Sequence, residues 1–186
     1  MEEFIGKRIM VIGSPGSGKS HFSTELSYCT GLPLFHLDRS HWSGDVGKWE
    51  HDDAQRFVEW QYRTVEDDEW IFDGNYIGTL NLRLSHADTV FYFNLPRLFC
   101  LFNYLRHLLF YAFHIKQSTE PRERFDPKFM KYIWNFKRAE LKERLREYPN
   151  VKVFIFRRKR DVKNFFLELE AHLDREREKR LKEMDL

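Results

Sequence analysis

The sequence contains few cysteines, almost no excess of either charge, and no long uninterrupted apolar run. Its two cysteines, Cys29 and Cys100, lie among apolar or helical residues at no metal-ligand spacing. We therefore predict two buried thiols in a reducing compartment. The 31 Lys and Arg residues nearly balance the 29 Asp and Glu residues, so the net charge of +2 gives the whole chain no bias toward nucleic acid.

The sequence also lacks a recognisable targeting signal or membrane span. The first three residues, Met-Glu-Glu, carry only negative side-chain charge, whereas a signal peptide begins with a basic region. The most apolar stretch, residues 98–113, is interrupted by Asn103, Arg106 and His107 and is shorter than a membrane span. We expect a cytoplasmic protein with no membrane partner.

Short apolar runs alternate with helical patterns along the chain. The runs are nearly continuous, which is typical of parallel strands covered by helices on both faces. With 186 residues, the chain fits one α/β domain, without internal repeats or a linker. The predicted strands are residues 7–12, 33–37, 70–72, 89–94 and 151–156. The predicted helices are residues 19–29, 52–65, 96–114 and 127–148, and a last one from about residue 161 that ends in a charged tail.

One motif predicts a phosphate site. Between the first predicted strand and the first predicted helix, the sequence reads Gly13, Ser14, Pro15, Gly16, Ser17, Gly18, Lys19, Ser20. This is the full pattern G-x-x-x-x-G-K-[ST], whose glycines let backbone N–H groups converge on phosphate oxygens at a helix N-terminus. We expect Lys19 to reach the β- and γ-phosphates and the Ser20 hydroxyl to bind Mg²⁺. ATP and Mg²⁺ are the predicted cofactors.

Two carboxylates follow predicted strands. Asp38 comes after the second strand and Asp73 ends the third, so both belong to the edge of the sheet where ligands of open α/β sheets bind. Asp73 is predicted to hold a magnesium-bound water, with a turn-forming Asp-Gly pair as the alternative. Asp38 is predicted to accept a proton from an attacking hydroxyl, with a helix cap or loop salt bridge as the alternative.

Five segments together point to a family. GSPGSGKS, GLPLFHLD, WIFDGNY with a later Arg83, ADTVFYFNLPR and ERFDPKFMKYIWNF resemble the FlaR-related "DNA topology modulation" P-loop proteins, which are similar to adenylate kinase and the small nucleoside kinases. The resemblance spans about residues 9–169. It implies an α/β, three-layer P-loop NTPase fold whose five-stranded parallel sheet has the order 2-3-1-4-5. It also implies a single domain over residues 1–186, with an acceptor-binding arm at about 38–66 and a mobile lid at about 114–125.

The lid is where the sequence departs from this family. Relatives typically carry an arginine-rich stretch of the form R-x-R-P-D-M before ERFD, and residues 112–122 do not match it. We predict Arg122 as the cation that faces the phosphates, with Arg106 as the second choice. In adenylate-kinase-like folds the loop after the fifth strand lies beside the ATP base, so the resemblance implies that Arg157 contacts the nucleotide.

The residues near Asp73 favour a hydroxyl acceptor. Nucleoside monophosphate kinases usually have a DGFPR block whose arginine grips the acceptor phosphate, whereas this chain reads DGNY and has no arginine until Arg83. A hydroxyl benefits from a base such as Asp38, and an ionised phosphate needs none. Arg83, which we also predict to be a catalytic residue, nevertheless keeps a phosphorylated acceptor open, as do Arg56 and Arg63. The aromatic residues that either stack on an acceptor base or sugar or simply pack are Trp42, Trp49 and Tyr76.

These patterns predict a P-loop kinase that moves the γ-phosphoryl group of ATP to a small acceptor, a nucleoside or a nucleotide. Two alternatives remain open: an ATPase or switch without an acceptor, and a DNA-topology modulator, which only the family name supports. The sequence has no helix-turn-helix pattern, zinc-ligand spacing or RNA-recognition motif, and its densest cationic run is residues 157–160. We therefore expect no specific nucleic-acid partner. Monomer and homodimer both remain open.

Overall fold

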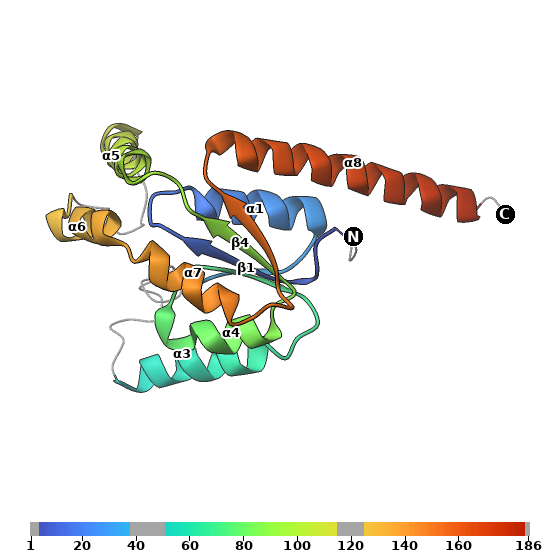
Figure 1. Cartoon of the computed structure of the whole chain (residues 1–186), viewed down its shortest axis with the longest axis horizontal. Coiled ribbons are helices and arrows are strands. Elements are labelled where there is room, and N and C mark those ends of the chain that lie inside the picture. The colour runs from blue at the N-terminus through green and yellow to red at the C-terminus, as the bar shows by residue number, and fades with distance from the viewer. Residues whose placement is uncertain (1–3, 38–50, 115–124, 185–186) are drawn as a thin grey trace.

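A parallel five-stranded sheet forms the centre of the fold (Figure 1). The computed structural model describes residues 4–37, 51–114 and 125–184. The strand order β2-β3-β1-β4-β5 confirms the predicted order 2-3-1-4-5. Most residues of the three central strands are buried, which explains why their sequences are apolar runs. The strands are β1 (Arg8–Gly13), β2 (Leu34–His36), β3 (Trp70–Asp73), β4 (Thr89–Phe93) and β5 (Lys152–Phe156).

Helices cover both faces of the sheet, and each face has its own apolar core. Ile9 and Val11 of β1 pack in one core, while Met10 and Ile12 pack in the other, because neighbouring side chains of a strand point to opposite faces. The first core is covered by α1 (Lys19–Thr30) and α8 (Lys159–Met184). The second is covered by α3 (His51–Thr64), α4 (Leu80–His86) and α7 (Arg138–Arg146). The helices α5 (Arg97–His114) and α6 (Pro127–Asn135) lie at the carboxyl edge of the sheet.

The helix predicted over residues 127–148 is wrong as a single element. It is broken between α6 and α7, where Phe136 has a non-helical backbone (φ −53°, ψ 125°). Ile133 packs in the core beneath α1 and α8, whereas Phe136 and Leu141 pack in the core on the opposite face. A straight helix could not serve both faces, so tertiary packing overrides the local helical preference.

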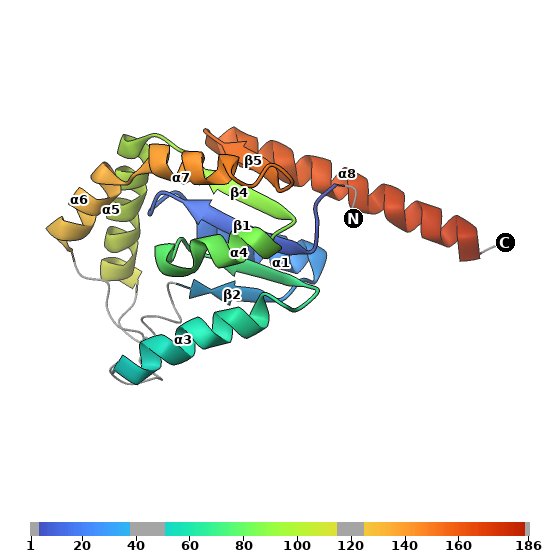
Figure 2. The ribbon, with the colours of Figure 1, turned by 60° about the horizontal axis from the view of Figure 1, so that its bottom comes forward.

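Two other elements differ from the sequence prediction. The short 3-10 turn η1 (Ile77–Thr79) and helix α4 follow β3, where no helix was predicted. Helix α8 starts two residues earlier than expected and continues through the charged tail, and its C-terminal half extends beyond the body of the molecule (Figure 2). In the part of the chain that the structure describes, no helix has the length and apolar character needed to cross a membrane.

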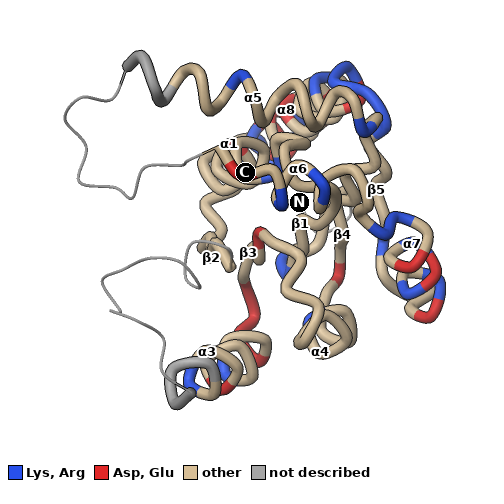
Figure 3. Tube along the Cα trace, turned by 90° about the vertical axis from the view of Figure 1, so that its left-hand side faces the viewer, with Lys and Arg blue, Asp and Glu red and all other residues tan. Residues whose placement is uncertain are grey.

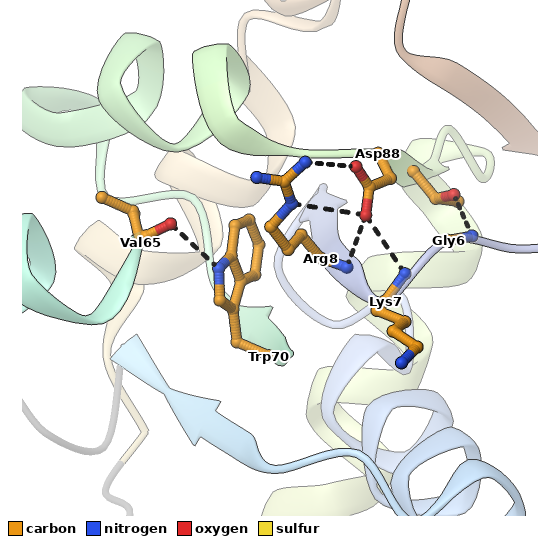
Figure 4. Close-up of polar contacts among 7 residues, drawn as sticks. Gly6, Lys7, Arg8, Val65, Trp70 and Asp88 are labelled. Atoms are coloured by element: carbon orange, nitrogen blue, oxygen red, sulfur yellow. Dashed lines mark hydrogen bonds and ion pairs between the residues drawn. The ribbon is translucent and has the colours of Figure 1, made fainter. Parts of the chain in front are cut away.

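An ion pair at the amino edge of the sheet ties β1 to β4 (Figure 4). The Asp88 carboxylate accepts hydrogen bonds from the backbone N–H groups of Lys7 (3.1 Å) and Arg8 (2.9 Å) and from the Arg8 guanidinium (2.8 Å). Burial by itself would raise the pKa of Asp88, but these bonds and the Arg8 charge together lower it. The carboxylate therefore stabilises the fold in its ionised form.

We expect Asp88→Asn to lower the free energy of unfolding by about 1–3 kcal/mol at neutral pH, because it weakens several hydrogen bonds to a charged acceptor. Since the folded-state pKa is lowered, this contribution is present above about pH 4 and is lost as the pH falls through the folded pKa. Chemical denaturation of both proteins at several pH values tests this, with Asp67→Asn as an exposed control. A stability difference that stays constant down to acidic pH would contradict the assignment.

Candidate active site

The loop between β1 and α1 takes a backbone path that glycine permits. Gly13 (φ +136°) and Gly16 (φ +71°) both have positive φ. A side chain at Gly13 would collide with the Phe93 carbonyl of β4, and one at Gly16 would collide with the Cys100 carbonyl of α5. The loop is therefore packed between β4 and α5, and Gly13 and Gly16 allow that close approach.

The N-terminus of α1 faces the same loop. Its first intrahelical bond runs from the Phe22 N–H to the Gly18 carbonyl (3.1 Å), and among the described residues no side chain caps the helix. The first-turn N–H groups and the positive end of the helix dipole therefore remain directed toward the loop. Lys19 is only 7% exposed, and its Nζ donates to the Ser14 carbonyl (3.1 Å), which holds the ammonium over the loop. Ser20 is exposed beside it.

Two asparagines from other parts of the chain make hydrogen bonds to the backbone of the glycine loop. Asn75 accepts a hydrogen bond from the Gly13 N–H and donates one to the Gly13 carbonyl, both at 2.9 Å. Asn103 of α5 donates to the Gly16 carbonyl (3.1 Å). Asn75 belongs to the DGNY segment that the sequence analysis singled out, but neither asparagine was assigned a role there, because contacts across 62 and 87 residues leave no local signal.

Asp73 ends β3 at the carboxyl edge of the sheet, which is the edge turned toward the viewer in Figure 3. Its Oδ2 lies 2.7 Å from Nδ1 of His36, the last residue of β2. Two buried polar atoms at this edge, Asp73 Oδ1 and Ser17 Oγ, have no hydrogen-bond partner among the described residues. Mg²⁺ in kinases is usually held by one or two carboxylates together with substrate phosphates, so Asp73 and Ser20 fit that ion chemically. His36 was not predicted as a site residue.

Arg83 lies in α4 and is fully buried. Its guanidinium donates to the carbonyls of Gly74 (3.1 Å), Asn75 (2.7 Å) and Tyr76 (2.8 Å). These bonds fix the segment that carries Asp73 and Asn75. Arg83 therefore stabilises the segment that follows β3. Its direct role in catalysis stays a prediction.

Arg138, at the start of α7, is a further cation, and none of the sequence motifs includes it. Its Nε and Nη2 are buried and have no hydrogen-bond partner within residues 4–37, 51–114 and 125–184. The Tyr92 hydroxyl donates to the backbone carbonyl of Arg138 (3.1 Å). In the sheet, Tyr92 of β4 is the register partner of Ile12, which lies just before the glycine loop. Burial raises the pKa of Tyr92, and the Arg138 charge opposes that shift. This guanidinium is therefore a candidate for binding an anion near the carboxyl edge.

The structure leaves the predicted roles of several other residues untested. Asp38, Trp42, Trp49 and Arg122 lie outside the described residues, as do most of the predicted lid and the first part of the predicted arm. Arg157 is exposed, and its backbone N–H donates to Asp161 Oδ2 (2.8 Å), which with the Arg158 N–H keeps the pKa of Asp161 low. Its contact with a nucleotide stays a prediction. Among the remaining predicted residues, Arg56 and Arg63 are exposed on α3, and Arg106 is exposed on α5. The ring of Tyr76 packs edge-on against Phe57, with 4.9 Å between the ring centroids.

A cavity of about 400 Å³ lies away from this site, at the amino edge of the sheet. Its lining includes Asp88 and Val151, which precede β4 and β5, so it faces away from the carboxyl edge where Lys19 and Asp73 lie. The chemistry of the candidate site therefore does not involve this cavity.

The fold is that of the P-loop kinases. A shikimate kinase from Bacteroides thetaiotaomicron superposes with a TM-score of 0.52 at 14% identity, covering 90% of this chain and 98% of that chain. A gluconokinase from Sinorhizobium meliloti 1021 gives a TM-score of 0.49 at 14% identity, covering 93% and 98%. No protein-family model and no curated protein sequence matches the chain. At these identities the likeness concerns the fold, and the acceptor has to be argued from the site.

Proposed function

We propose that this protein is an ATP-dependent phosphotransferase that moves the γ-phosphoryl group to a small acceptor, a nucleoside or a nucleotide. The observation that carries the proposal is the meeting of three features at one sheet edge. These are the glycine loop at the uncapped N-terminus of α1, the ammonium of Lys19 over that loop, and the buried Asp73 carboxylate with one unpartnered oxygen. Together they provide donors for phosphate oxygens and a carboxylate for a metal ion.

Each of these side chains has a distinct role in the proposal. Lys19 neutralises charge on the β- and γ-phosphates, and it is already held in place by the Ser14 carbonyl. Ser20 and Asp73 hold Mg²⁺, directly or through water, and the ion when bound draws charge from the transferred group. Asp38, which follows β2, accepts the proton of the acceptor hydroxyl, and Arg122 and Arg157 contact the phosphates and the base.

The contacts of Arg83 support a hydroxyl acceptor. In an enzyme that grips an acceptor phosphate, an arginine after this strand would be expected to face the substrate. Arg83 is instead fully buried and donates to three loop carbonyls. A nucleoside therefore fits the site better than a nucleotide, although Arg56 and Arg63 of α3 would allow a phosphorylated acceptor to bind.

The finer parts of the proposal rest on the sequence. We propose that the chain is related to the FlaR-like P-loop proteins, acts in the cytoplasm and has no specific nucleic-acid partner. Figure 3 supports the last point, because the basic residues of the described chain are densest where α8 begins and mix with acidic ones on α3 and α7. Recognition of a base sequence requires a reading element together with a broader basic face.

Ligand-induced stabilisation tests the proposal. With Mg²⁺ present, ATP at 100 times its dissociation constant should raise the free energy of unfolding by about 2.7 kcal/mol, which appears as a higher Tm. A panel of nucleosides and nucleotides, added with a non-hydrolysable ATP analogue, should then identify the acceptor by a further rise. Mg²⁺ alone is the control. A protein whose Tm does not respond to ATP with Mg²⁺ would contradict nucleotide binding at this loop.

A further inference from the structure

We propose that His36 is a positioning residue for the metal ion of the phosphate site. Its imidazole binds one oxygen of Asp73 and so keeps the other oxygen directed toward the ion that accompanies the nucleotide. This inference rests on the proposed function, because it concerns the same site. It adds a residue to which the sequence patterns assigned no role.

The sheet places the two side chains next to each other. His36 and Asp73 are register partners on the adjacent parallel strands β2 and β3, so their side chains leave the sheet on the same face. That face is the one covered by α1, because Ile71, two residues before Asp73, packs in the core that contains Phe22 and Leu26 of α1. The pair therefore lies on the side of the sheet where α1 presents Lys19 and Ser20.

The contact between the two side chains is short and largely buried. Nδ1 of His36 lies 2.7 Å from Oδ2 of Asp73, and the side chains are 20% and 4% exposed. Because a carboxylate oxygen can only accept, Nδ1 carries the hydrogen and donates it. The other oxygen, Oδ1, is buried and has no hydrogen-bond partner within the described ranges. A carboxylate bound at one oxygen and unpartnered at the other has a defined rotation and a defined open ligand position.

Without the imidazole, the orientation of the Asp73 carboxylate would no longer be fixed. The carboxylate could then rotate about its terminal bond, which has a broad torsional preference, and the oxygen directed toward the metal would no longer be fixed. Hydrogen bonds that orient a metal-binding side chain are typically worth 10–100-fold in metal affinity or activity. A role limited to joining β2 to β3 would instead lower stability and leave the metal dependence unchanged, so the two roles can be separated.

The test is calorimetric titration of ATP into the full chain, over a range of Mg²⁺ concentrations and also in EDTA. His36→Leu removes the donor. His36→Gln keeps a polar group but places its amide near the position of Nε2, and His36→Asn places an amide N–H near Nδ1. We expect His36→Leu and His36→Gln to bind ATP normally in EDTA and to need about 10–100-fold more Mg²⁺ for the metal-dependent gain in affinity. His36→Asn should recover most of that loss.

His86→Leu is the matched control, because His86 also pairs with a carboxylate, that of Glu66 (3.3 Å), away from the loop. It should titrate like the wild type. The inference is overturned if His36→Gln, which retains a polar side chain at the edge of the sheet, shows the wild-type Mg²⁺ requirement, or if His36→Asn restores nothing. Wild-type protein that binds no ATP with or without Mg²⁺ would instead contradict the proposed function itself, and the inference with it.

Discussion

Lys19→Ala is expected to lower the rate of phosphoryl transfer about 10³-fold or more while the protein remains folded. The Lys19 ammonium is bound to the Ser14 carbonyl of the glycine loop, and preorganised cations of this kind stabilise the charge that develops on the transferred group. In the free protein the buried ammonium donates a hydrogen bond to the Ser14 carbonyl, so we expect its loss to lower the free energy of unfolding by about 1.5–3 kcal/mol. Steady-state turnover and Tm of the purified variant measure the two effects separately.

The control for this variant is Lys7→Ala. Lys7 lies just before β1, at the opposite end of the strand from the loop, and pairs with Glu69 on the surface (2.9 Å). An exposed pair of this kind contributes little to stability and has no access to the phosphate site. Turnover of Lys7→Ala should therefore equal that of the wild type. Wild-type turnover in Lys19→Ala would show that the loop does not bind the transferred phosphate.

Arg83→Met should lower the free energy of unfolding by about 3–5 kcal/mol. The substitution leaves the carbonyls of Gly74, Asn75 and Tyr76 without a charged donor in a buried position, and each such bond is worth about 1.5–3 kcal/mol before losses of additivity. Chemical denaturation measures the loss. Nucleotide affinity should fall with it, since Asn75 of the same segment holds both backbone groups of Gly13.

Arg144→Met of α7 is the matched control for Arg83. Its guanidinium donates to the Asn81 side chain (3.2 Å) at the surface, so its loss should change stability by less than about 1 kcal/mol. If Arg83→Met proved as stable as the wild type but had lost turnover, the function of Arg83 would be to bind a substrate and not to stabilise the segment of Gly74, Asn75 and Tyr76. That result would favour a phosphorylated acceptor.

Local sequence signals were sufficient to predict the sheet. Each of the three central strands is a short apolar run, because helices on both faces bury most of its side chains. The phosphate loop was equally visible, because its backbone path requires glycine at positions 13 and 16 and its chemistry requires Lys19 in the following helix. The strand order came from the resemblance, since apolar runs alone do not specify their neighbours.

The rest of the site depends on contacts that have no local signature. His36 is an ordinary strand residue until β2 pairs with β3 and brings it beside Asp73. Arg83 was predicted as a catalytic residue that could also contact a phosphorylated acceptor, because the sequence does not show that α4 buries it against three carbonyls. The break at Phe136 likewise follows from the need to supply both apolar cores, which is a property of the assembled sheet.

The transfer reaction itself tests the central claim most directly. Wild-type protein is incubated with Mg²⁺, ATP that carries a radioactive γ-phosphate, and each nucleoside and nucleotide in turn, and the labelled products are separated. Our account predicts that one acceptor takes up the label while ADP forms in equal amount, and that Lys19→Ala transfers none. Label that appears only as inorganic phosphate would indicate an ATPase or switch, and no loss of ATP with any acceptor would contradict the assignment as a kinase.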